Sequence, residues 1–239
     1  MKNLCNSYSL EPIGYISSPY KEKFAVPRQP GLAPDIISTI NFYPPYNDEL
    51  AFIGLESFSH LHVLFLFDKV EYTKFRPKVR PPRLGGNQSV GVFATRSPFR
   101  PNRIGLSIVE IKRIVKEKGK VSIEVSGADL VDNTPIIDIK PYIPFVDAKA
   151  DAKGGFATEA PELLKVNYSD EALEFIKQRG DLKIKAIEQS LAQDPRPAYK
   201  DDEDQRLYQA RLYNLIISFK VTDNEVMVVK VEEDKADGC

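Results

Sequence analysis

Short apolar segments separated by closely spaced turn signals fill the chain from residue 13 to residue 143, and they leave little room for helices. We expect strands at 13–17, 36–43, 60–70, 89–95, 105–115, 121–125 and 136–143, with one short helix near 47–53. Residues 116–120, which include Gly119, are typical of a hairpin turn between two of these strands. Many short strands at this spacing predict a mainly β fold, either a sandwich or a barrel.

The sequence changes character after residue 147. Residues 148–158 are rich in Ala, Asp and Lys and contain two adjacent glycines, which is typical of a linker. Ser169 and Asp181 are suitable N-caps for helices over 170–178 and 182–193, and alternating segments at 212–221 and 226–231 predict a strand hairpin with Asp223-Asn224 at its turn. We therefore divide the chain into a mainly β domain (1–147), a linker (148–158) and a small α+β domain (159–239).

The bulk composition is that of an ordinary globular protein, with 42% hydrophobic and 28% charged residues in a chain of 239. No apolar run approaches the length that spans a bilayer, and the first ten residues do not form a secretory signal. The two cysteines, Cys5 and Cys239, have neither metal-binding nor disulfide spacing, so we expect a reducing, cytoplasmic location. The two glycine-rich motifs that cradle phosphates, Gly-x-Gly-x-x-Gly and Gly-x-x-x-x-Gly-Lys-Ser/Thr, are both absent from the sequence.

Positive charge is concentrated in one stretch of the first domain. Residues 1–147 carry 19 Lys and Arg against 15 Asp and Glu, whereas residues 148–239 carry 14 against 19. Between Tyr72 and Val109 there is no acidic residue and there are eight basic ones: Lys74, Arg76, Lys78, Arg80, Arg83, Arg96, Arg100 and Arg103. Such a field attracts a polyanion such as a nucleic acid, although a solvated basic loop would have the same composition.

A loop rich in arginine and proline, residues 95–105, joins two of the expected strands. Pro98 and Pro101 fix the backbone, so its arginines lose less entropy when they bind a partner. Guanidinium groups suit carboxylate and phosphate oxygens. The alternative is a rigid connection whose arginines pair with nearby acids.

A second loop, residues 127–135, places Asp129 and Asp132 after a strand, and Asp138 and Lys140 follow it. Carboxylates accept hydrogen bonds from ribose hydroxyls and amines, and Asn133 tolerates the left-handed conformation of a tight turn. The alternative is that both acids bond only to local backbone amides.

Three further segments admit two interpretations each. His60 and His62 share a strand face and could bind a metal, but no third ligand is evident, so we expect none. In the second domain, residues 194–199 present an arginine and a tyrosine that could contact RNA, or they pack between the domains. Residues 21–31 form a polar loop in which Gln29 could bind a purine, or a plain surface loop.

Two long strings carry a family resemblance: Gly-Val-Phe-Ala-Thr-Arg-Ser-Pro-Phe-Arg-Pro-Asn at 91–102 and Asp-Ile-Lys-Pro-Tyr at 138–142. Together with 13–31, 54–61, 76–103, 129–144 and 194–199, they make the chain resemble the TrmO (TsaA-like) family of S-adenosylmethionine-dependent tRNA methyltransferases over almost its whole length. The resemblance implies an N-terminal antiparallel β-barrel with a small C-terminal α+β domain. It also implies a homodimer that methylates N6 of threonylcarbamoyladenosine at position 37, beside the anticodon.

The resemblance also implies roles for individual residues. The S-adenosylmethionine site would comprise Pro27, Arg28, Gln29, Phe67, Asp68, Arg96, Leu106, Gly127, Ala128, Asp129 and Leu130. We expect tRNA contacts from Arg76, Lys78, Arg80, Arg83, Arg100 and Arg103 in the basic stretch, and from Arg196 and Tyr199. As catalytic residues, Asp132 would accept an N–H hydrogen bond or the departing proton, and Lys140 would either hold the threonyl carboxylate or pair with Asp138.

The chain departs from the family pattern at four positions. Asn133 stands where the family often has Gly, and we expect the tight turn to survive. Arg103 replaces a frequent Pro, Asp68 a frequent His, and His62 a Trp found in some relatives, so no imidazole role is expected at position 68. Two other functions stay open: a tRNA-binding module without catalysis, which would not bind the cofactor, and a small-molecule methyltransferase, which would show little salt dependence.

Overall fold

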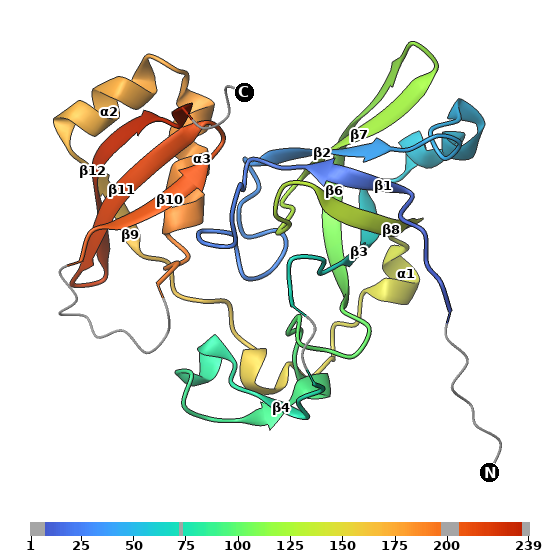
Figure 1. Cartoon of the computed structure of the whole chain (residues 1–239), viewed down its shortest axis with the longest axis horizontal. Coiled ribbons are helices and arrows are strands. Elements are labelled where there is room, and N and C mark those ends of the chain that lie inside the picture. The colour runs from blue at the N-terminus through green and yellow to red at the C-terminus, as the bar shows by residue number, and fades with distance from the viewer. Residues whose placement is uncertain (1–7, 72–73, 197–205, 236–239) are drawn as a thin grey trace.

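The computed structural model describes residues 8–71, 74–196 and 206–235, which form two β units side by side (Figure 1). The first unit is a closed antiparallel barrel with the strand order β1-β2-β7-β6-β3-β8. Its strands are β1 (Gly14–Ser17), β2 (Ile37–Phe42), β3 (His60–Leu66), β6 (Ile104–Glu117), β7 (Lys120–Ser126) and β8 (Thr134–Pro141). The structure confirms the mainly β prediction and, of the two architectures left open by the strand pattern, selects the barrel.

Alternating side chains fill the barrel. Ile16, Ile40, Val63, Ile123 and Ile136 all point inward and are almost fully buried in one hydrophobic core. Because successive side chains of a strand point to opposite faces, the residues between them face outward. The predicted hairpin turn between β6 and β7 is present.

A long insertion, residues 67–103, leaves the barrel between β3 and β6 and carries most of the basic stretch. It contains two short paired strands, β4 (Lys78–Val79) and β5 (Val90–Gly91), and the 3-10 turns η3 (Pro82–Leu84) and η4 (Val92–Ala94). The strand expected over 89–95 is therefore wrong beyond Gly91. The strand ends at Gly91 because the amide and the hydroxyl of Thr95 both donate to the carbonyl oxygen of Val92 and close a tight turn.

Two short 3-10 helices replace the helix expected near 47–53: η1 (Glu49–Phe52) and η2 (Leu55–Ser57). Asp48 caps the first by accepting from the Leu50 amide. After β8, a short helix α1 (Pro144–Asp147) and a turn η5 (Gly155–Ala157) lead to the second unit.

The second unit is a four-stranded sheet with two helices packed on it. Its elements are β9 (Lys165–Tyr168), α2 (Asp170–Lys177), α3 (Asp181–Leu191), β10 (Tyr208–Leu212), β11 (Leu215–Thr222) and β12 (Glu225–Glu233), in the strand order β10-β11-β12-β9. Ser169 caps α2 as predicted, by accepting from the Ala172 amide. Helix α3, in contrast, has Gly180 at its N-cap instead of the expected Asp181.

The predicted β11–β12 hairpin is confirmed, with positive φ at both Asp223 and Asn224. The strand expected at 212–221 is broken by a turn at Tyr213, where φ is +59°, so Leu212 belongs to β10. Strand β9 was not predicted, and of β10 only Leu212 belongs to a predicted strand.

The loop between β1 and β2, residues 18–36, connects the two units. Tyr20, Ala25, Ala33 and Ile36 are buried in the same core as the helices and sheet of the second unit. Tyr20 also pairs with Leu212 at the end of β10. Figure 1 shows this loop reaching from the barrel toward the second unit. The loop thus contributes buried side chains to the core of the second unit and is not the plain surface loop that the sequence also allowed.

Candidate functional site

Three loops meet at one rim of the barrel: residues 18–36, residues 95–103 and residues 127–133. The Gly31 amide donates to the Gly127 carbonyl over 2.8 Å. Arg96 donates through Nη1 to Gln29 Oε1 over 2.6 Å. The fold therefore brings together three segments that are separate motifs in the sequence.

Gly127 permits the close approach of two of these loops. Its φ is +72°, and a Cβ at this position would lie 3.0 Å from the Cα of Gly31. Its amide donates to the Ile36 carbonyl over 3.3 Å. Only glycine combines this backbone conformation with this contact at low cost.

Asp129 is the buried acid of the rim. Its Oδ1 accepts a 2.5 Å hydrogen bond from the hydroxyl of Ser107, which is itself buried in β6. Burial raises the pKa of the Asp129 carboxyl, although the Ser107 hydrogen bond and the positive charge of Arg96 act in the opposite direction. A buried carboxyl beside a guanidinium is a combination that binding sites use.

The neighbours of Asp129 differ from it in orientation. Ala128 and Leu130 are 1% and 2% exposed, and both belong to the barrel core. Their side chains are therefore not available to a ligand at the rim, and only their backbone groups are. Ser107 was not among the predicted site residues; a polar side chain at an inward position of an alternating strand is the signal that could have identified it.

Arg28 is fastened to the second unit. Its Nη2 donates to the carbonyl oxygens of Asp194 and Arg196, over 3.2 and 3.1 Å. Pro27 beside it is buried. The residues expected to hold the cofactor on this loop are thus positioned by the second unit.

Arg196 does not have the surroundings expected of a tRNA contact. It is 5% exposed, and its Nε and Nη2 donate to the two carboxylate oxygens of Asp194, each over 2.9 Å. A phosphate contact requires an accessible guanidinium, so the structure corrects this expectation in favour of packing between the units. Tyr199 lies outside the described residues.

Phe67, Asp68 and Leu106 lie near the same end of the barrel but on different faces. The Phe67 amide donates to the Arg103 carbonyl over 2.8 Å, and its ring packs edge-on against Phe65. Asp68 is exposed. Leu106 is 53% exposed on the outer face of β6, opposite to the inward side chain of Ser107. The structure therefore does not bring the Leu106 side chain to Asp129.

Asp132 fastens the rim. Its Oδ1 accepts from the Ser18 amide over 2.8 Å, and its Oδ2 accepts from Lys21 over 3.2 Å and from the Asn133 side chain over 3.1 Å. Asn133 has φ +62°, which confirms the left-handed turn predicted for it. These three donors leave one acceptor position on Oδ1 for a substrate N–H. Of the two partners considered for Lys140, the structure pairs it with Asp138, over 3.0 Å.

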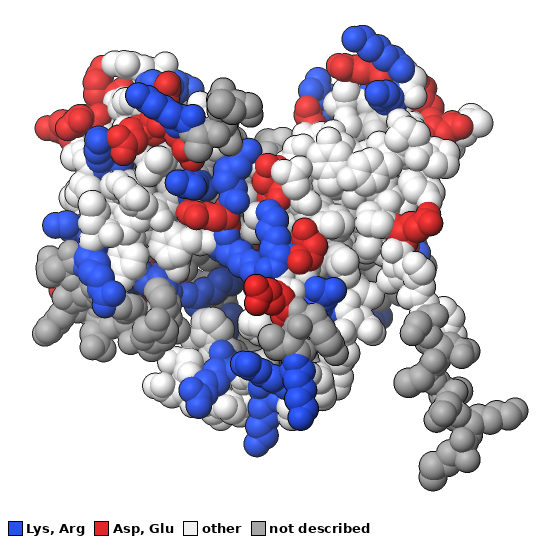
Figure 2. All heavy atoms as spheres, in the orientation of Figure 1, with Lys and Arg blue, Asp and Glu red and all other residues white. Residues whose placement is uncertain are grey.

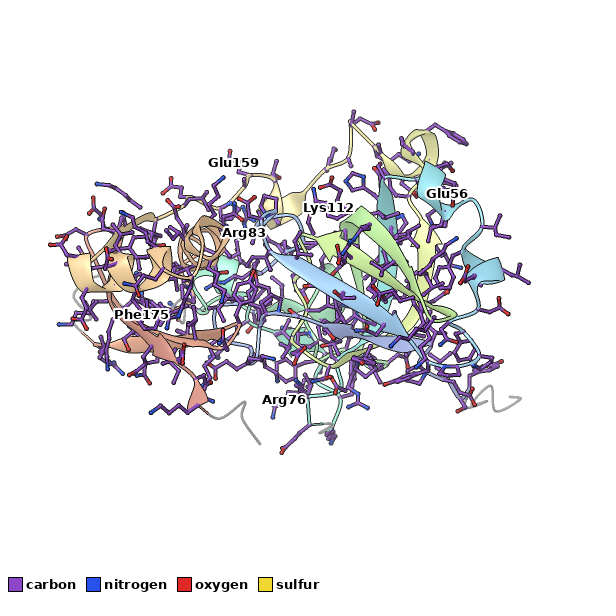
Figure 3. The ribbon with its side chains drawn as sticks, turned by 90° about the horizontal axis from the view of Figure 1, so that it is seen from above. Glu56, Arg76, Arg83, Lys112, Glu159 and Phe175 are labelled. Carbon is purple, nitrogen blue, oxygen red and sulfur yellow. The ribbon has the colours of Figure 1, made fainter. Side chains whose placement is uncertain are left out.

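The basic residues separate into two groups. Arg100 and Arg103 donate to the backbone carbonyls of Thr95 and Val70, each over 3.0 Å, so both help to hold the backbone at this end of the barrel. Arg103 has φ +51°, a conformation that the proline frequent at this position in relatives cannot adopt. Arg83 donates to the backbone carbonyl of Glu159, which lies beside it in Figure 3.

The second group is exposed on the insertion. Arg76, Lys78 and Arg80 are all exposed, and Figure 2 shows Lys and Arg atoms gathered over the region of β4 at the bottom of the view. More of them line the hollow between the two units, where acidic groups are interspersed. This surface has the charge needed to attract a polyanion.

The two histidines have separate partners. The Nδ1 of His60 lies 2.8 Å from the Ser59 hydroxyl, and the Nε2 of His62 lies 3.0 Å from Oδ2 of Asp147. Among the described residues, no group of three His, Cys, Asp or Glu side chains is placed to hold a metal ion. Nor does any helix in the described part have the length and apolar character to cross a membrane.

Comparison with known proteins agrees with this arrangement. Residues 15–148 match the family model of the tRNA-methyltransferase O N-terminal domain, and residues 161–234 match that of the TrmO C-terminal domain. The Escherichia coli (strain K12) tRNA (adenine(37)-N6)-methyltransferase is 46% identical, over 95% of this chain and 99% of its own. A Pseudomonas aeruginosa protein named as an S-adenosylmethionine-dependent methyltransferase, RcsF, is 48% identical over 87% of this chain and 90% of its own.

A solved structure gives the same answer. The crystal structure of TrmO from Pseudomonas aeruginosa has a TM-score of 0.78 and 38% identity, and the match covers 95% of this chain and 99% of that one. The fold and the matched domains define the class as a β-barrel tRNA methyltransferase. The chain belongs to the TrmO family, whose N- and C-terminal domain models together match nearly its whole length.

Proposed function

We propose that this protein transfers a methyl group from S-adenosylmethionine to N6 of threonylcarbamoyladenosine at position 37 of tRNA. The observation that carries this proposal is the rim itself, where the positive charge of Arg96 acts on the mostly buried Asp129 beside an exposed basic insertion. The Escherichia coli relative, named for methylation of N6 of adenine 37, supports the position and the atom. The threonylcarbamoyl group on that adenosine is not part of the relative's name and is our own addition.

The chemistry of the rim fits S-adenosylmethionine. A guanidinium such as Arg96 suits the methionyl carboxylate, and a buried acceptor such as Asp129 suits ribose hydroxyls or the ammonium group. When bound, S-adenosylmethionine supplies the methyl group as an electrophile. We assign its binding to Pro27, Arg28, Gln29, Phe67, Asp68, Arg96, Gly127, Ala128, Asp129 and Leu130, with Ala128 and Leu130 acting through their backbones; the outward-facing Leu106 side chain is left out of this set.

The chain's own contribution is mainly positioning. An adenine N6 amine is a weak nucleophile, and holding it in line and close to the methyl group can lower the barrier by ~7 kcal/mol or more. Lys140 pairs with Asp138 and lies opposite His62, six residues along β8 from the rim end at Thr134, so the contact with the threonyl carboxylate falls to other residues of the rim. Asp132 would serve chiefly to fix the 127–133 loop and, through that loop, Asp129.

Asp132→Asn tests that assignment. The substitution weakens the hold on Ser18 and Lys21, so we expect weaker cofactor binding and reduced turnover together. Loss of turnover with unchanged cofactor affinity would instead restore the role of proton acceptor. Full turnover with intact binding would exclude both.

The outer face of the barrel supports a homodimer. Leu106 and Ile108 on β6 are 53% and 38% exposed, and Phe145 on α1 is 86% exposed. A second copy of the chain covering this face would remove apolar surface from water. Light scattering of the purified protein checks the mass: a dimeric value is expected, and a monomeric value at micromolar concentration contradicts it.

The deciding experiment measures methyl transfer from labelled S-adenosylmethionine to two tRNA preparations, one with threonylcarbamoyladenosine and one without it. Label only in the modified tRNA is expected, and a tRNA with guanosine at position 37 serves as the negative control. Binding of the cofactor is measured separately by calorimetry. Cofactor binding without label in any tRNA would point to a small-molecule acceptor, and tRNA binding without cofactor binding would point to a non-catalytic module.

A further inference from the structure

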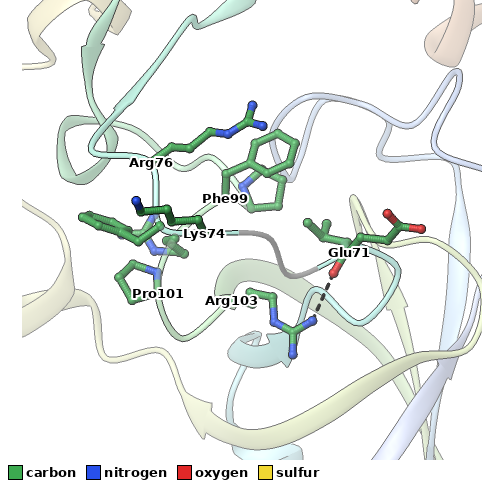
Figure 4. Close-up of a pocket in the computed structure, with 10 residues that line it drawn as sticks. Glu71, Lys74, Arg76, Phe99, Pro101 and Arg103 are labelled. Carbon is green, nitrogen blue, oxygen red and sulfur yellow. Dashed lines mark hydrogen bonds between the residues drawn. The ribbon is translucent and has the colours of Figure 1, made fainter.

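A pocket lies in the insertion, beside the rim but not part of it. It is a shallow hollow open to solvent, between the segment that follows β3 and the loop that precedes β6 (Figure 4). One wall is formed by Lys74, Phe75 and Arg76, and the other by Pro98, Phe99 and Pro101.

The walls combine aromatic rings with positive charge. Phe99 is 56% exposed and Phe75 is 44% exposed, so both present large apolar surfaces to water. Lys74 and Arg76 are exposed beside them, and Glu71 is the one acid among the described lining residues. An inorganic anion would not need the rings, and an apolar ligand would not need the cations. Single-stranded RNA needs both, because bases stack on aromatic faces while phosphates lie near Lys and Arg.

Hydrogen bonds and prolines hold one wall of the pocket, the 95–103 loop. Arg103 donates to the Val70 carbonyl over 3.0 Å, the bond drawn in Figure 4, and Arg100 donates to the Thr95 carbonyl over 3.0 Å. Pro98 and Pro101 fix the backbone on both sides of Phe99. Phe99 is therefore presented by a loop that loses little entropy when a ring stacks on it.

The pocket and the rim share the 95–103 loop. Arg96 on this loop faces Gln29 at the rim, and Phe99, three residues later, lines the pocket. On the other wall, the Phe67 amide bonds to the Arg103 carbonyl. A nucleotide in the pocket would thus be a near neighbour of a nucleotide at the rim.

We propose that this pocket receives one unstacked base that flanks the methylated adenosine, stacked on Phe99, with Lys74 and Arg76 contacting its phosphates. This inference rests on the proposed tRNA substrate and deepens it. It assigns Phe99 and Phe75, which no charge-based prediction included, to substrate binding.

The test uses the full chain and an anticodon stem-loop RNA that carries 2-aminopurine at one or the other position beside adenosine 37. Wild-type protein should change the fluorescence at one of the two positions. Phe99→Leu should abolish that change and weaken RNA binding by about 5- to 150-fold, whereas Phe99→Tyr should retain both. Phe58→Leu is the matched control, because Phe58 is 37% exposed before the start of β3, at the end away from the insertion, and does not line the pocket.

Three results would overturn the inference. RNA binding by Phe99→Leu at wild-type strength, in a protein whose wild type methylates tRNA, would exclude the pocket and leave the proposed function standing. An equal loss in Phe58→Leu would replace the pocket with a general apolar surface. Absence of RNA binding by the wild type would overturn both proposals. Calorimetry with S-adenosylmethionine should give the same affinity for all variants, which separates the pocket from the cofactor site.

Discussion

The amide of Gly31 donates to the carbonyl of Gly127 over 2.8 Å, and this bond joins a loop of the second unit's core to the rim of the barrel. Because a Cβ on Gly127 would lie 3.0 Å from the Cα of Gly31, Gly127→Ala has to push the loops apart. We expect it to destabilise the protein by about 1–3 kcal/mol and to weaken cofactor binding.

Gly119→Ala is the matched control for that substitution. Gly119 has nearly the same φ, +71°, but no atom lies within 4 Å of the Cβ position. It should lose stability from backbone strain alone and keep full cofactor affinity. Thermal unfolding and calorimetry of both variants measure the difference; equal cofactor affinities would exclude a role for the close approach.

Asp129 should make stability depend on pH. Burial is the main cause that raises its pKa in the folded protein, so the folded state holds its proton at higher pH than the unfolded chain does. Its contribution to the unfolding free energy is therefore full below the unfolded pKa, about 3.9, and is lost as pH rises through the folded pKa. Asp129→Asn should remove this loss and keep an acceptor for Ser107.

Urea unfolding between about pH 4 and pH 8 provides the test. The unfolding free energy of Asp129→Asn minus that of wild type should increase as pH rises, because only the wild type loses stability. Asp151→Asn, at an exposed position of the predicted linker, should show no such trend. A difference that stays constant with pH would disprove the argument from burial.

Tyr20 should support both units. It is fully buried, and its hydroxyl lies 3.4 Å from the Ser190 hydroxyl on α3. Tyr20→Ala leaves a cavity and should cost about 3–5 kcal/mol, whereas Tyr20→Phe loses one hydrogen bond and should cost about 1 kcal/mol. Chemical denaturation measures both; Tyr8→Ala, at an 84% exposed position, is expected to be neutral. Small costs for both variants would mean that the loop contributes little.

The exposed charges of the insertion should govern the salt dependence of tRNA binding. Replacing Arg76, Lys78 and Arg80 together with Gln should lower the slope of log affinity against log salt by up to about 2, or 0.7 for each phosphate contact. The affinity for S-adenosylmethionine should not change. Replacing Lys116, Lys118 and Lys120 at the β6–β7 turn removes the same charge elsewhere and should leave the slope intact. Equal slopes in both triple variants would exclude a tRNA role for the insertion.

Local patterns were sufficient for much of the fold. Alternation predicted the barrel strands because each has one face in a single core, and positive φ at Asp223, Asn224 and Asn133 followed from residue types that tolerate it. Helix α2 began at its predicted cap because Ser169 accepts from an amide within the same turn. The domain boundaries at 147 and 158 stay a prediction.

The errors have a common origin in contacts between distant segments. The short strand β9 has its parallel partner β12 some 60 residues away, so nothing local marks it. Arg196 was expected at the surface because arginine usually lies there, yet its bonds to Asp194 and its place between the units bury it. Ser107 belongs to the site because the barrel places β6 beside the loop of Asp129, which is 22 residues away in the sequence. The role of Phe99 likewise depends on a neighbouring segment that lies more than 20 residues away.

The burial of the β1–β2 loop in the second unit means that the two halves of this protein are interlocked rather than linked end to end. A proteolytic cut in the exposed stretch 148–158 would break the chain without freeing the pieces, because Tyr20, Ala25, Ala33 and Ile36 would stay inside the other fragment. Fragments made separately should each be poorly soluble and should recover their shape when mixed. A chimera that exchanges the C-terminal half of one relative for another must therefore carry residues 18–36 with it.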